Sequence, residues 1–367
     1  MTRLTGSFWD KPPVMSENPK VGVIILSYRN FGHVKGCVDS VLVSTYRDFK
    51  IYLVDNGSEK PVIDAIRERY GSRPEIEMIE NGSNLGYAEG NNSAIRIARS
   101  GLIVFLNNDT VVDRGWLEPM VALMEKNADI GACQPKVLDM KDRSKFEYAG
   151  AAGGFIDGYG YPFLRGRIFD TVETDNGQYD DNAELDWSSG TAFMVRNSVL
   201  KETGLFDPLY FMYGEENDLC WRIRRCGYKI VFAHDSTVYH LGKGSISGRP
   251  LFKLHLNHRN GIILLIKNLP LNRLIIVLPV RFALDIANSL FYLVDRPLSF
   301  RWISILWAYL ELIFLMPKVA AARRSAQTLY KRYGKEARYP KYGISIIYQY
   351  FFLGRKKFNE LPLRGKT

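Results

Sequence analysis

Short apolar runs alternate with amphipathic segments through the first 110 residues of the chain. Four runs predict strands, at residues 21–26, 49–54, 75–79 and 102–106, and three segments with helical periodicity predict helices, at residues 31–43, 60–70 and 88–99. The run at 102–106 is continuously apolar, as in a strand that is covered on both faces. This order predicts an α/β fold with a mostly parallel central sheet flanked by helices.

The pattern becomes irregular after Asp113, a residue suited to be the N-cap of a helix ending near residue 126. Residues 140–185 are rich in Gly, Asp and Tyr and predict long loops over a site. The remaining predicted elements are a strand at 191–196, helices at 197–203 and 215–226, and strands at 229–232 and 237–240. We expect an extension at 1–18 and a domain at 19–250, whose two halves are 19–112 and 113–250.

The last third of the chain has a different composition. Residues 251–367 contain 20 of the 49 basic residues but only 5 of the 39 acidic ones, so the rest of the chain is slightly acidic. Two apolar segments lie within this basic tail, at 261–280 and 302–316. Polar residues and prolines interrupt the first, and the second is shorter than the roughly 20 residues needed to cross a bilayer.

We therefore expect both tail segments to be helices that lie on an anionic membrane surface. Trp302, Trp307 and Tyr309 are residue types that favour the membrane interface. Two alternatives are a helical subdomain packed on the rest of the protein and a single tilted span. The apolar runs fit lipid better than nucleic acid, so no nucleic-acid partner is expected.

The cysteines and the N-terminal residues indicate a reducing environment. Cys37, Cys133, Cys220 and Cys226 show no CxxC spacing, which argues against a disulfide framework or a zinc site. The first residues lack the apolar core of a signal peptide. Both observations predict a cytosolic location.

Polar clusters follow the predicted strands, at residues 27–30, 55–58, 84–92 and 107–109. In a parallel sheet these clusters share the carboxyl edge, where a nucleotide can lie. The chain lacks a GxGxxG loop after its first strand and a GxxxxGK[ST] loop, which argues against a dinucleotide site and a P-loop NTPase. Asp109 ends the last cluster and is a candidate ligand for a metal or phosphate site, although the same residues also suit a plain turn.

A second acidic cluster, Glu215, Glu216 and Asp218, opens a predicted helix that ends in basic residues. Favourable interaction with the helix dipole explains part of this arrangement. Three acids within four residues also raise one another's pKa, which suits a proton acceptor.

Taken together, the motifs SYRN, VDNGS, NLGYAEGNN, LNNDT, GTAFMVR, FMYGEENDLCWR and VYHLGKGS resemble a family 2 glycosyltransferase of the rhamnosyltransferase-like branch. The resemblance runs in order from about residue 21 to 245. It implies a GT-A fold, a nucleotide-sugar donor, a divalent metal (Mg²⁺ or Mn²⁺) and inversion at the anomeric carbon. It also implies that the C-terminal helical region associates with a membrane.

The resemblance assigns donor-binding roles to Ser27, Tyr28, Asp55, Asn84, Gly86, Asn107, Asn108 and Lys243. Asp109 matches the last acid of the family's DxD motif, whereas Asn107 replaces the first. A single carboxylate implies modest metal affinity, with the donor phosphates completing the shell. His240 matches a histidine that reaches the metal and that favours Mn²⁺, while a lone histidine also fits a structural role.

The resemblance places the catalytic base at Glu216, with Asp218 or Glu215 able to share the role. Gly190 permits close approach in the acceptor and sugar pocket. Trp187 is expected to stack on a sugar face, and a plain core position is its alternative.

The expected activity is transfer of a sugar, with rhamnose as one candidate, from a dTDP- or UDP-sugar to a glycan or lipid-linked saccharide. Such transfer belongs to cell-surface polysaccharide synthesis at the cytoplasmic face of the membrane. Two alternatives are a sugar nucleotidyltransferase, whose Gly-rich phosphate loop is missing here, and a membrane-docked protein that binds sugar nucleotides without transfer.

Overall fold

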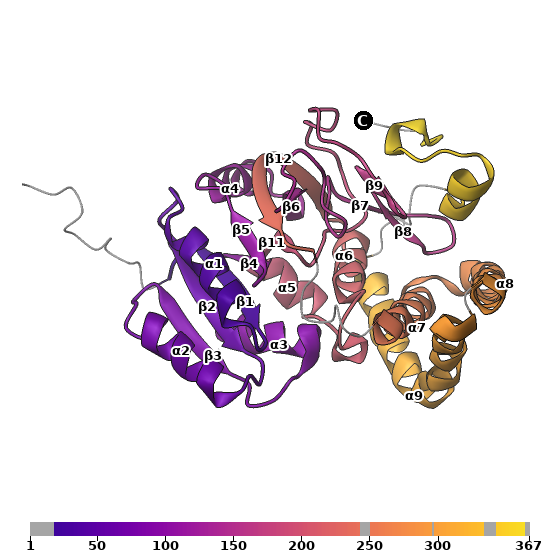
Figure 1. Cartoon of the computed structure of the whole chain (residues 1–367), viewed down its shortest axis with the longest axis horizontal. Coiled ribbons are helices and arrows are strands. Elements are labelled where there is room, and N and C mark those ends of the chain that lie inside the picture. The colour runs from indigo at the N-terminus through magenta and orange to yellow at the C-terminus, as the bar shows by residue number, and fades with distance from the viewer. Residues whose placement is uncertain (1–17, 243–249, 296, 334–342, 364–367) are drawn as a thin grey trace, which may run out of the picture.

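The computed structural model describes residues 18–242, 250–295, 297–333 and 343–363. Figure 1 shows a central sheet flanked by helices, with long C-terminal helices gathered at one end of the molecule. The sheet has eight strands in the order β3-β2-β1-β4-β11-β6-β12-β5, and most of its neighbouring strands are parallel. The predicted α/β class and mostly parallel sheet are confirmed.

The N-terminal half follows the predicted alternation. Its elements are β1 (Val21–Ser27), α1 (Phe31–Leu42), β2 (Phe49–Asp55), α2 (Lys60–Tyr70), β3 (Ile76–Glu80), α3 (Gly86–Ile95) and β4 (Leu102–Asn107). The parallel register pairs Ser27 with Asp55 and Leu26 with Asn107. The polar clusters that end these strands therefore meet at one edge of the sheet, because parallel strands share their carboxyl ends.

The other half of the sheet contains two strands that the hydrophobic pattern did not predict, at Thr110–Val112 and Ile130–Asp139. It consists of β5 (Thr110–Val112), β6 (Ile130–Asp139), β11 (Ala192–Arg196) and β12 (Lys229–His240), with α4 (Leu117–Lys126), α5 (Asn197–Thr203) and α6 (Glu215–Arg225). β6 is buried along almost its whole length, but Gln134, Pro135 and Lys136 interrupt its apolar pattern. The two predicted strands near residues 229–240 are the single strand β12, whose pairing is irregular between Ala233 and Thr237.

Two further predictions for this half need correction. α4 begins at Leu117 and not at Asp113, because the chain first makes a turn in which the Trp116 N–H donates to the Asp113 carbonyl over 3.2 Å. The segment expected to be loops carries a small antiparallel sheet of β7 (Gly154–Ile156), β8 (Pro162–Leu164), β9 (Arg167–Ile168) and β10 (Thr171–Val172).

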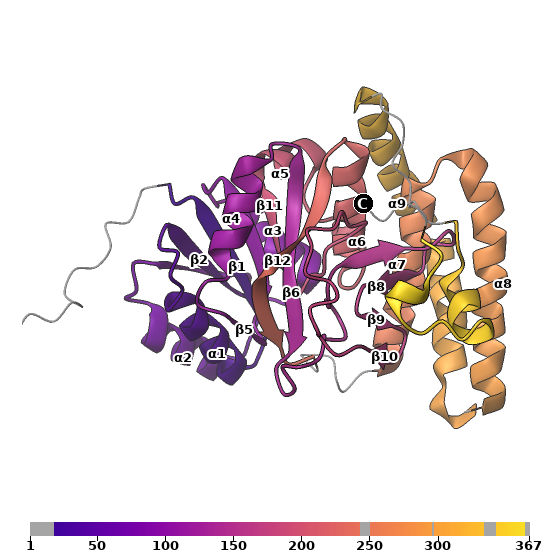
Figure 2. The ribbon, with the colours of Figure 1, turned by 90° about the horizontal axis from the view of Figure 1, so that it is seen from above.

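The basic tail forms α7 (Pro250–Asn268), α8 (Leu271–Asp295) and α9 (Arg301–Tyr333), followed by a π-helical turn at Tyr348–Phe352. Figure 2 shows the three helices together at the end of the molecule opposite α1 and α2. α8 and α9 are each long and apolar enough to cross a membrane by length and composition. The predicted segment at 302–316 is thus only part of α9, and the length of this helix does not by itself separate a membrane span from a helix that lies on the surface.

The tail helices share packing with the rest of the protein. Leu264 and Leu265 of α7 and Phe358 belong to the same buried cluster as Phe193 of β11. Phe358 lies against Phe155 of the small sheet, with ring centroids 4.8 Å apart. α7 also contacts α6, so the helix that carries the acidic cluster is held between the sheet and the tail.

Candidate active site

The ends of β1 and β2 form one side of the candidate site. The Oδ2 atom of Asp55 accepts hydrogen bonds of 3.0 Å from the backbone N–H groups of Gly57 and Ser58, which fixes the carboxylate. The Oδ1 atom of Asp55 and the Oγ atom of Ser27 are buried without a hydrogen-bond partner in the described part of the chain. Buried polar atoms are nearly always paired, so these two atoms indicate a ligand position.

The loop before α3 approaches these strand ends from the side. The Asn84 side chain accepts from the Gly86 N–H (2.9 Å) and from Asn56 Nδ2 (3.2 Å). Gly86 has φ of +77°, and a Cβ atom there would lie 2.4 Å from the carbonyl oxygen of Phe211. Only glycine fits this close approach. The Tyr87 N–H donates to the same Phe211 carbonyl over 2.7 Å. This hydrogen bond joins the start of α3 to the segment before α6.

Asp109 and His240 meet at the far side of the same edge. β5 pairs antiparallel with the end of β12 and places Thr110 opposite His240. This register brings Asp109 Oδ1 to 3.1 Å from His240 Nε2, and both side chains are buried. The sequence had linked these two residues only through the family resemblance.

Glu147 is a site residue that the sequence did not reveal. It lies in the segment expected to be a loop, and its Oε2 atom is 3.2 Å from His240 Nδ1. Burial alone would lower the pKa of His240, but the Asp109 and Glu147 carboxylates outweigh it and raise that pKa to about 10. The imidazole therefore lies between two carboxylates, which favour its protonated form.

The Asp109–His240 pair fits two positions of a metal shell. Two ligands that bind one ion at about 2.1 Å and at a right angle stand about 3.0 Å apart, close to the observed 3.1 Å. The same distance is that of a hydrogen bond from the protonated imidazole to Asp109, so His240 would bind a metal only after losing the proton on Nε2. The residues that the structure describes contain no group of three or more His, Cys, Asp or Glu able to hold a metal ion. A metal at this pair therefore needs further ligands from a bound molecule.

Glu215 and Glu216 open α6 directly after Gly214. Glu216 Oε2 accepts from the Gly214 N–H over 3.1 Å. Burial raises the pKa of both carboxyls, and the neighbouring Glu216 raises that of Glu215 further. The added effect of Glu216 on Glu215 makes Glu216 the carboxyl of the pair that ionises more readily.

Asp218 has a structural environment that does not suit a shared base. It is fully buried and contacts Arg222 (2.9 Å), Lys267 (2.8 Å) and Asn268 (3.0 Å). Burial opposes ionisation, but Lys267 and Arg222 outweigh it and lower the pKa of Asp218 to about 2. A carboxylate with so low a pKa, and with its oxygens already engaged, is a poor proton acceptor.

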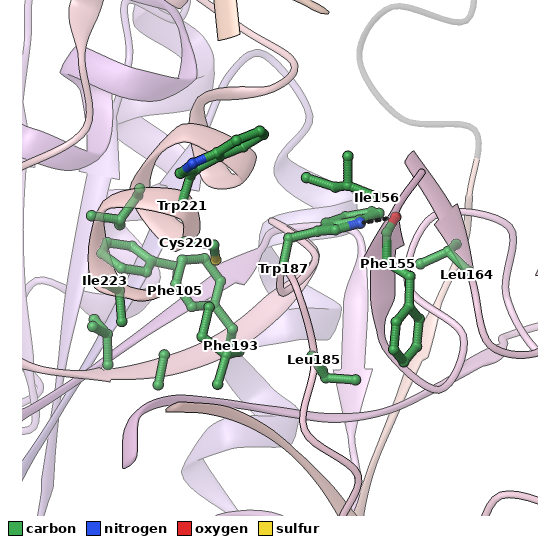
Figure 3. Packing of buried hydrophobic residues seen from close by; sticks show 14 of the residues in the cluster. Phe105, Phe155, Ile156, Leu164, Leu185, Trp187, Phe193, Cys220, Trp221 and Ile223 are labelled. Atoms are coloured by element: carbon green, nitrogen blue, oxygen red, sulfur yellow. Dashed lines mark hydrogen bonds between the residues drawn. The ribbon is translucent and has the colours of Figure 1, made fainter. Parts of the chain in front are cut away.

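Gly190 and Trp187 occupy different environments. The Gly190 carbonyl accepts from the Tyr87 hydroxyl over 2.7 Å, and the next carbonyl, that of Thr191, accepts from Asn107 N–H over 2.9 Å. Gly190 therefore lies between the end of β4 and the start of α3. Trp187 is buried, and Figure 3 shows its indole N–H directed at the Phe155 carbonyl, 3.0 Å away. The core alternative describes its position better than the expected sugar stacking.

The other predicted residues lie at the margins. Tyr28 is half-buried and carries the Arg29 guanidinium 4.7 Å above its ring. Asn107 and Asn108 are half-buried between β4 and β5. Lys243 and Ser245 lie outside the described residues.

Part of the chain matches a known protein family. Residues 22–203 match the model of the family described as "Glycosyl transferase family 2". A relative from Mycobacterium tuberculosis, "N-acetylglucosaminyl-diphospho-decaprenol L-rhamnosyltransferase", is 25% identical over 260 residues, which cover 66% of this chain and 83% of that protein.

Two solved structures share the fold. TarS from S. aureus (residues 1–349) superposes with a TM-score of 0.52 at 15% identity and covers 87% of this chain and 93% of its own. The mannosyltransferase PcManGT from Pyrobaculum calidifontis, in complex with GDP-Man and Mn²⁺, gives 0.50 at 15% identity and covers 94% and 91%. The predicted GT-A fold is confirmed.

Proposed function

Because residues 22–203 form a glycosyl transferase family 2 domain, we propose that this glycosyltransferase moves a sugar from a nucleoside-diphosphate donor to an acceptor hydroxyl with inversion. One observation carries the proposal. The unpartnered oxygen of Asp55 and the Asp109–His240 pair lie on the same edge of the sheet. A ligand with a polar base at one end and a diphosphate at the other can place its base at Asp55 and its diphosphate at the Asp109–His240 pair.

The nucleoside end of the donor is assigned to Ser27, Tyr28, Asp55 and Asn84. Asp55 Oδ1 is a buried acceptor that lacks a donor among the described residues. Uracil and thymine both present an N3–H group that satisfies such an acceptor, which supports a UDP- or dTDP-sugar. Rhamnose is the first candidate for the sugar, since the Mycobacterium tuberculosis relative is named as a rhamnosyltransferase.

The diphosphate end is assigned to Asp109 and His240. These residues would hold Mg²⁺ or Mn²⁺, which neutralises charge on the departing diphosphate when bound. Mn²⁺ accompanies the donor in the mannosyltransferase with the same fold. Glu147 lies on the opposite nitrogen of His240 and keeps Nε2 directed toward Asp109.

The acceptor hydroxyl is activated by Glu216. One oxygen of its carboxylate accepts from the Gly214 N–H, which fixes the direction of the carboxylate. Its raised pKa makes it a better proton acceptor than an ordinary carboxylate. The hydroxyl attacks the anomeric carbon from the face opposite the nucleotide while its proton passes to Glu216.

The acceptor is proposed to be a lipid-linked saccharide, since the name of the relative gives N-acetylglucosaminyl-diphospho-decaprenol as its acceptor. The apolar faces of α8 and α9 support a membrane location at the cytoplasmic face. Side chains on these faces that are more than half exposed include Leu271, Ile275, Ile276, Phe291, Val294, Trp307, Ile313 and Phe314. Exposed apolar area of this extent marks an interaction surface.

A donor panel tests the proposal. The full-length protein is incubated with nucleotide sugars, Mg²⁺ or Mn²⁺, and lipid-linked saccharides, and both nucleoside diphosphate and glycolipid product are measured. The proposal predicts metal-stimulated transfer from one donor. Donor binding without transfer to any acceptor would instead support the non-catalytic alternative, and synthesis of a nucleotide sugar would support the nucleotidyltransferase.

A further inference from the structure

The three tail helices enclose an apolar groove of about 370 Å³ that the candidate active site does not use. Its walls include Ile262 and Ile266 of α7, Leu278 and Phe282 of α8, and Ile313 and Met316 of α9. No polar atom contributes to its surface, since the hydroxyl of the lining Tyr309 donates to Asp285 over 2.8 Å. Such a groove has nothing to hold water or a sugar, and it suits a hydrocarbon.

The groove lies close behind the catalytic helix. Ile262 and Leu312 of its walls form one buried cluster with Tyr210, which precedes α6. Asn260, two residues before Ile262, donates to the carbonyls of Met212 (2.8 Å) and Tyr213. At about 1.5 Å per residue, the first lining residue, Ile262, lies about 3 Å along α7 from this anchor.

The groove is open toward the exposed apolar face of α8 and α9. Phe282 and Ile313 line the groove and are also 48% and 65% exposed. A chain that lies in a bilayer against this face therefore has a direct lateral path into the groove. The volume is near the lower end of ordinary ligand pockets, which fits one chain better than a protein partner.

From these three observations we infer that the groove between α7, α8 and α9 binds the isoprenoid chain of the lipid-linked acceptor. The inference rests on the proposed function, because that function supplies the acceptor. The sugar of such an acceptor lies at Glu216, its diphosphate crosses the Tyr210–Gly214 segment, and its hydrocarbon enters the groove. The proximity of the groove to α6 favours this occupant over ordinary bilayer lipid.

The test uses the full-length protein in detergent and a photoreactive isoprenyl diphosphate that carries no sugar. Ile313→Trp fills the groove from its exposed rim, and Phe314→Trp makes the same change on the neighbouring residue, which does not line it. Crosslinking to α7–α9 peptides should fall about tenfold in Ile313→Trp, because excluding two methylenes has about that effect on affinity. Phe314→Trp should leave it unchanged.

The same variants are assayed for transfer to a long-chain acceptor and to its water-soluble short-chain counterpart. Ile313→Trp should lower kcat/KM for the long chain about tenfold and leave the short chain unaffected, which also shows that the variant is folded. Three results would each overturn the inference. The first is an equal effect of Ile313→Trp on both acceptors, and the second is equal crosslinking by a photoreactive phosphatidylcholine. The third is loss of an oligomer in the variant without a change in its preference for the long-chain acceptor. Groove crosslinking without any transfer would support it while refuting the proposed function.

Discussion

Replacing Asp218 with Asn changes one charge at the point where the tail helices hold the catalytic helix. Asp218 lies in the first turn of α6, and its carboxylate contacts Arg222, Lys267 and Asn268. Asparagine keeps the shape of the side chain but leaves Arg222 and Lys267 buried with less negative charge. Lys267 retains only Asp207, 2.5 Å away.

The magnitude follows from the pKa of Asp218, which is lowered from the ordinary 3.8 to about 2. At about 1.4 kcal/mol per pKa unit, this shift corresponds to roughly 2.5 kcal/mol of stability. Removing one member of a buried ion pair typically costs about 3–5 kcal/mol, because the partner charge stays buried. We therefore expect Asp218→Asn to lower the free energy of unfolding by about 2–5 kcal/mol.

The sign of the pH dependence is fixed by the direction of the shift. Because the pKa of Asp218 is lower in the folded state, its contribution is complete above the ordinary pKa of 3.8. It is lost as the pH falls from there through about 2. The stability difference between wild type and variant should be constant from pH 5 to 8 and shrink below pH 4.

Thermal unfolding in detergent measures this difference, with a fall in Tm of about 3–6 °C expected at neutral pH for a chain of 367 residues. Asp142→Asn is the matched control, since Asp142 has a pKa also lowered to about 2 but an exposed side chain that pairs with Lys145. That variant should unfold like wild type, because solvent screens exposed ion pairs. If Asp218→Asn and Asp142→Asn gave the same Tm, the proposed anchoring of α6 would be wrong.

Three further predictions concern the donor side and the base. Glu147→Gln should weaken Mn²⁺ binding in the presence of nucleoside diphosphate by about 10–100-fold, because the Glu147 carboxylate then no longer orients His240. Calorimetry measures the affinity for Mn²⁺, and Asp170→Asn, at an exposed position, should leave that affinity unchanged. Gly86→Ala should reduce affinity for the nucleoside diphosphate far more than Gly82→Ala, because both have positive φ but only Gly86 abuts Phe211. On the acidic side, kcat should fall with a midpoint above pH 4.5, because burial raises the pKa of Glu216 and transfer needs its ionised form. A midpoint below pH 4.5 would contradict the role of Glu216 as base.

The sequence predicted the first half of the fold well because β1, β2 and β4 are mainly apolar runs, each followed by a polar cluster. Their shared edge followed from parallel pairing, which brought Ser27 beside Asp55. β6 was missed because its hydrogen bonding to two neighbours, and not a simple apolar pattern, defines it.

The site was less predictable where it depends on contacts between distant segments. Glu147 lies in a region of weak pattern, and only the folded chain brings it to His240. The difference between Glu216 and Asp218 was also hidden, because it arises from Lys267 and Asn268 of α7, about 50 residues further along the chain. The groove has the same origin, since three separate helices form its walls.

The most direct test of the account compares donor binding and sugar transfer in Glu216→Gln. The variant keeps the size of the side chain, and we predict a donor affinity within about threefold of wild type, because Glu216 acts on the acceptor. We predict that single-turnover transfer falls by about 10²–10⁴-fold, the usual contribution of a general base. Transfer at a near-wild-type rate would contradict the assignment of Glu216, and with it the proposed mechanism of direct displacement.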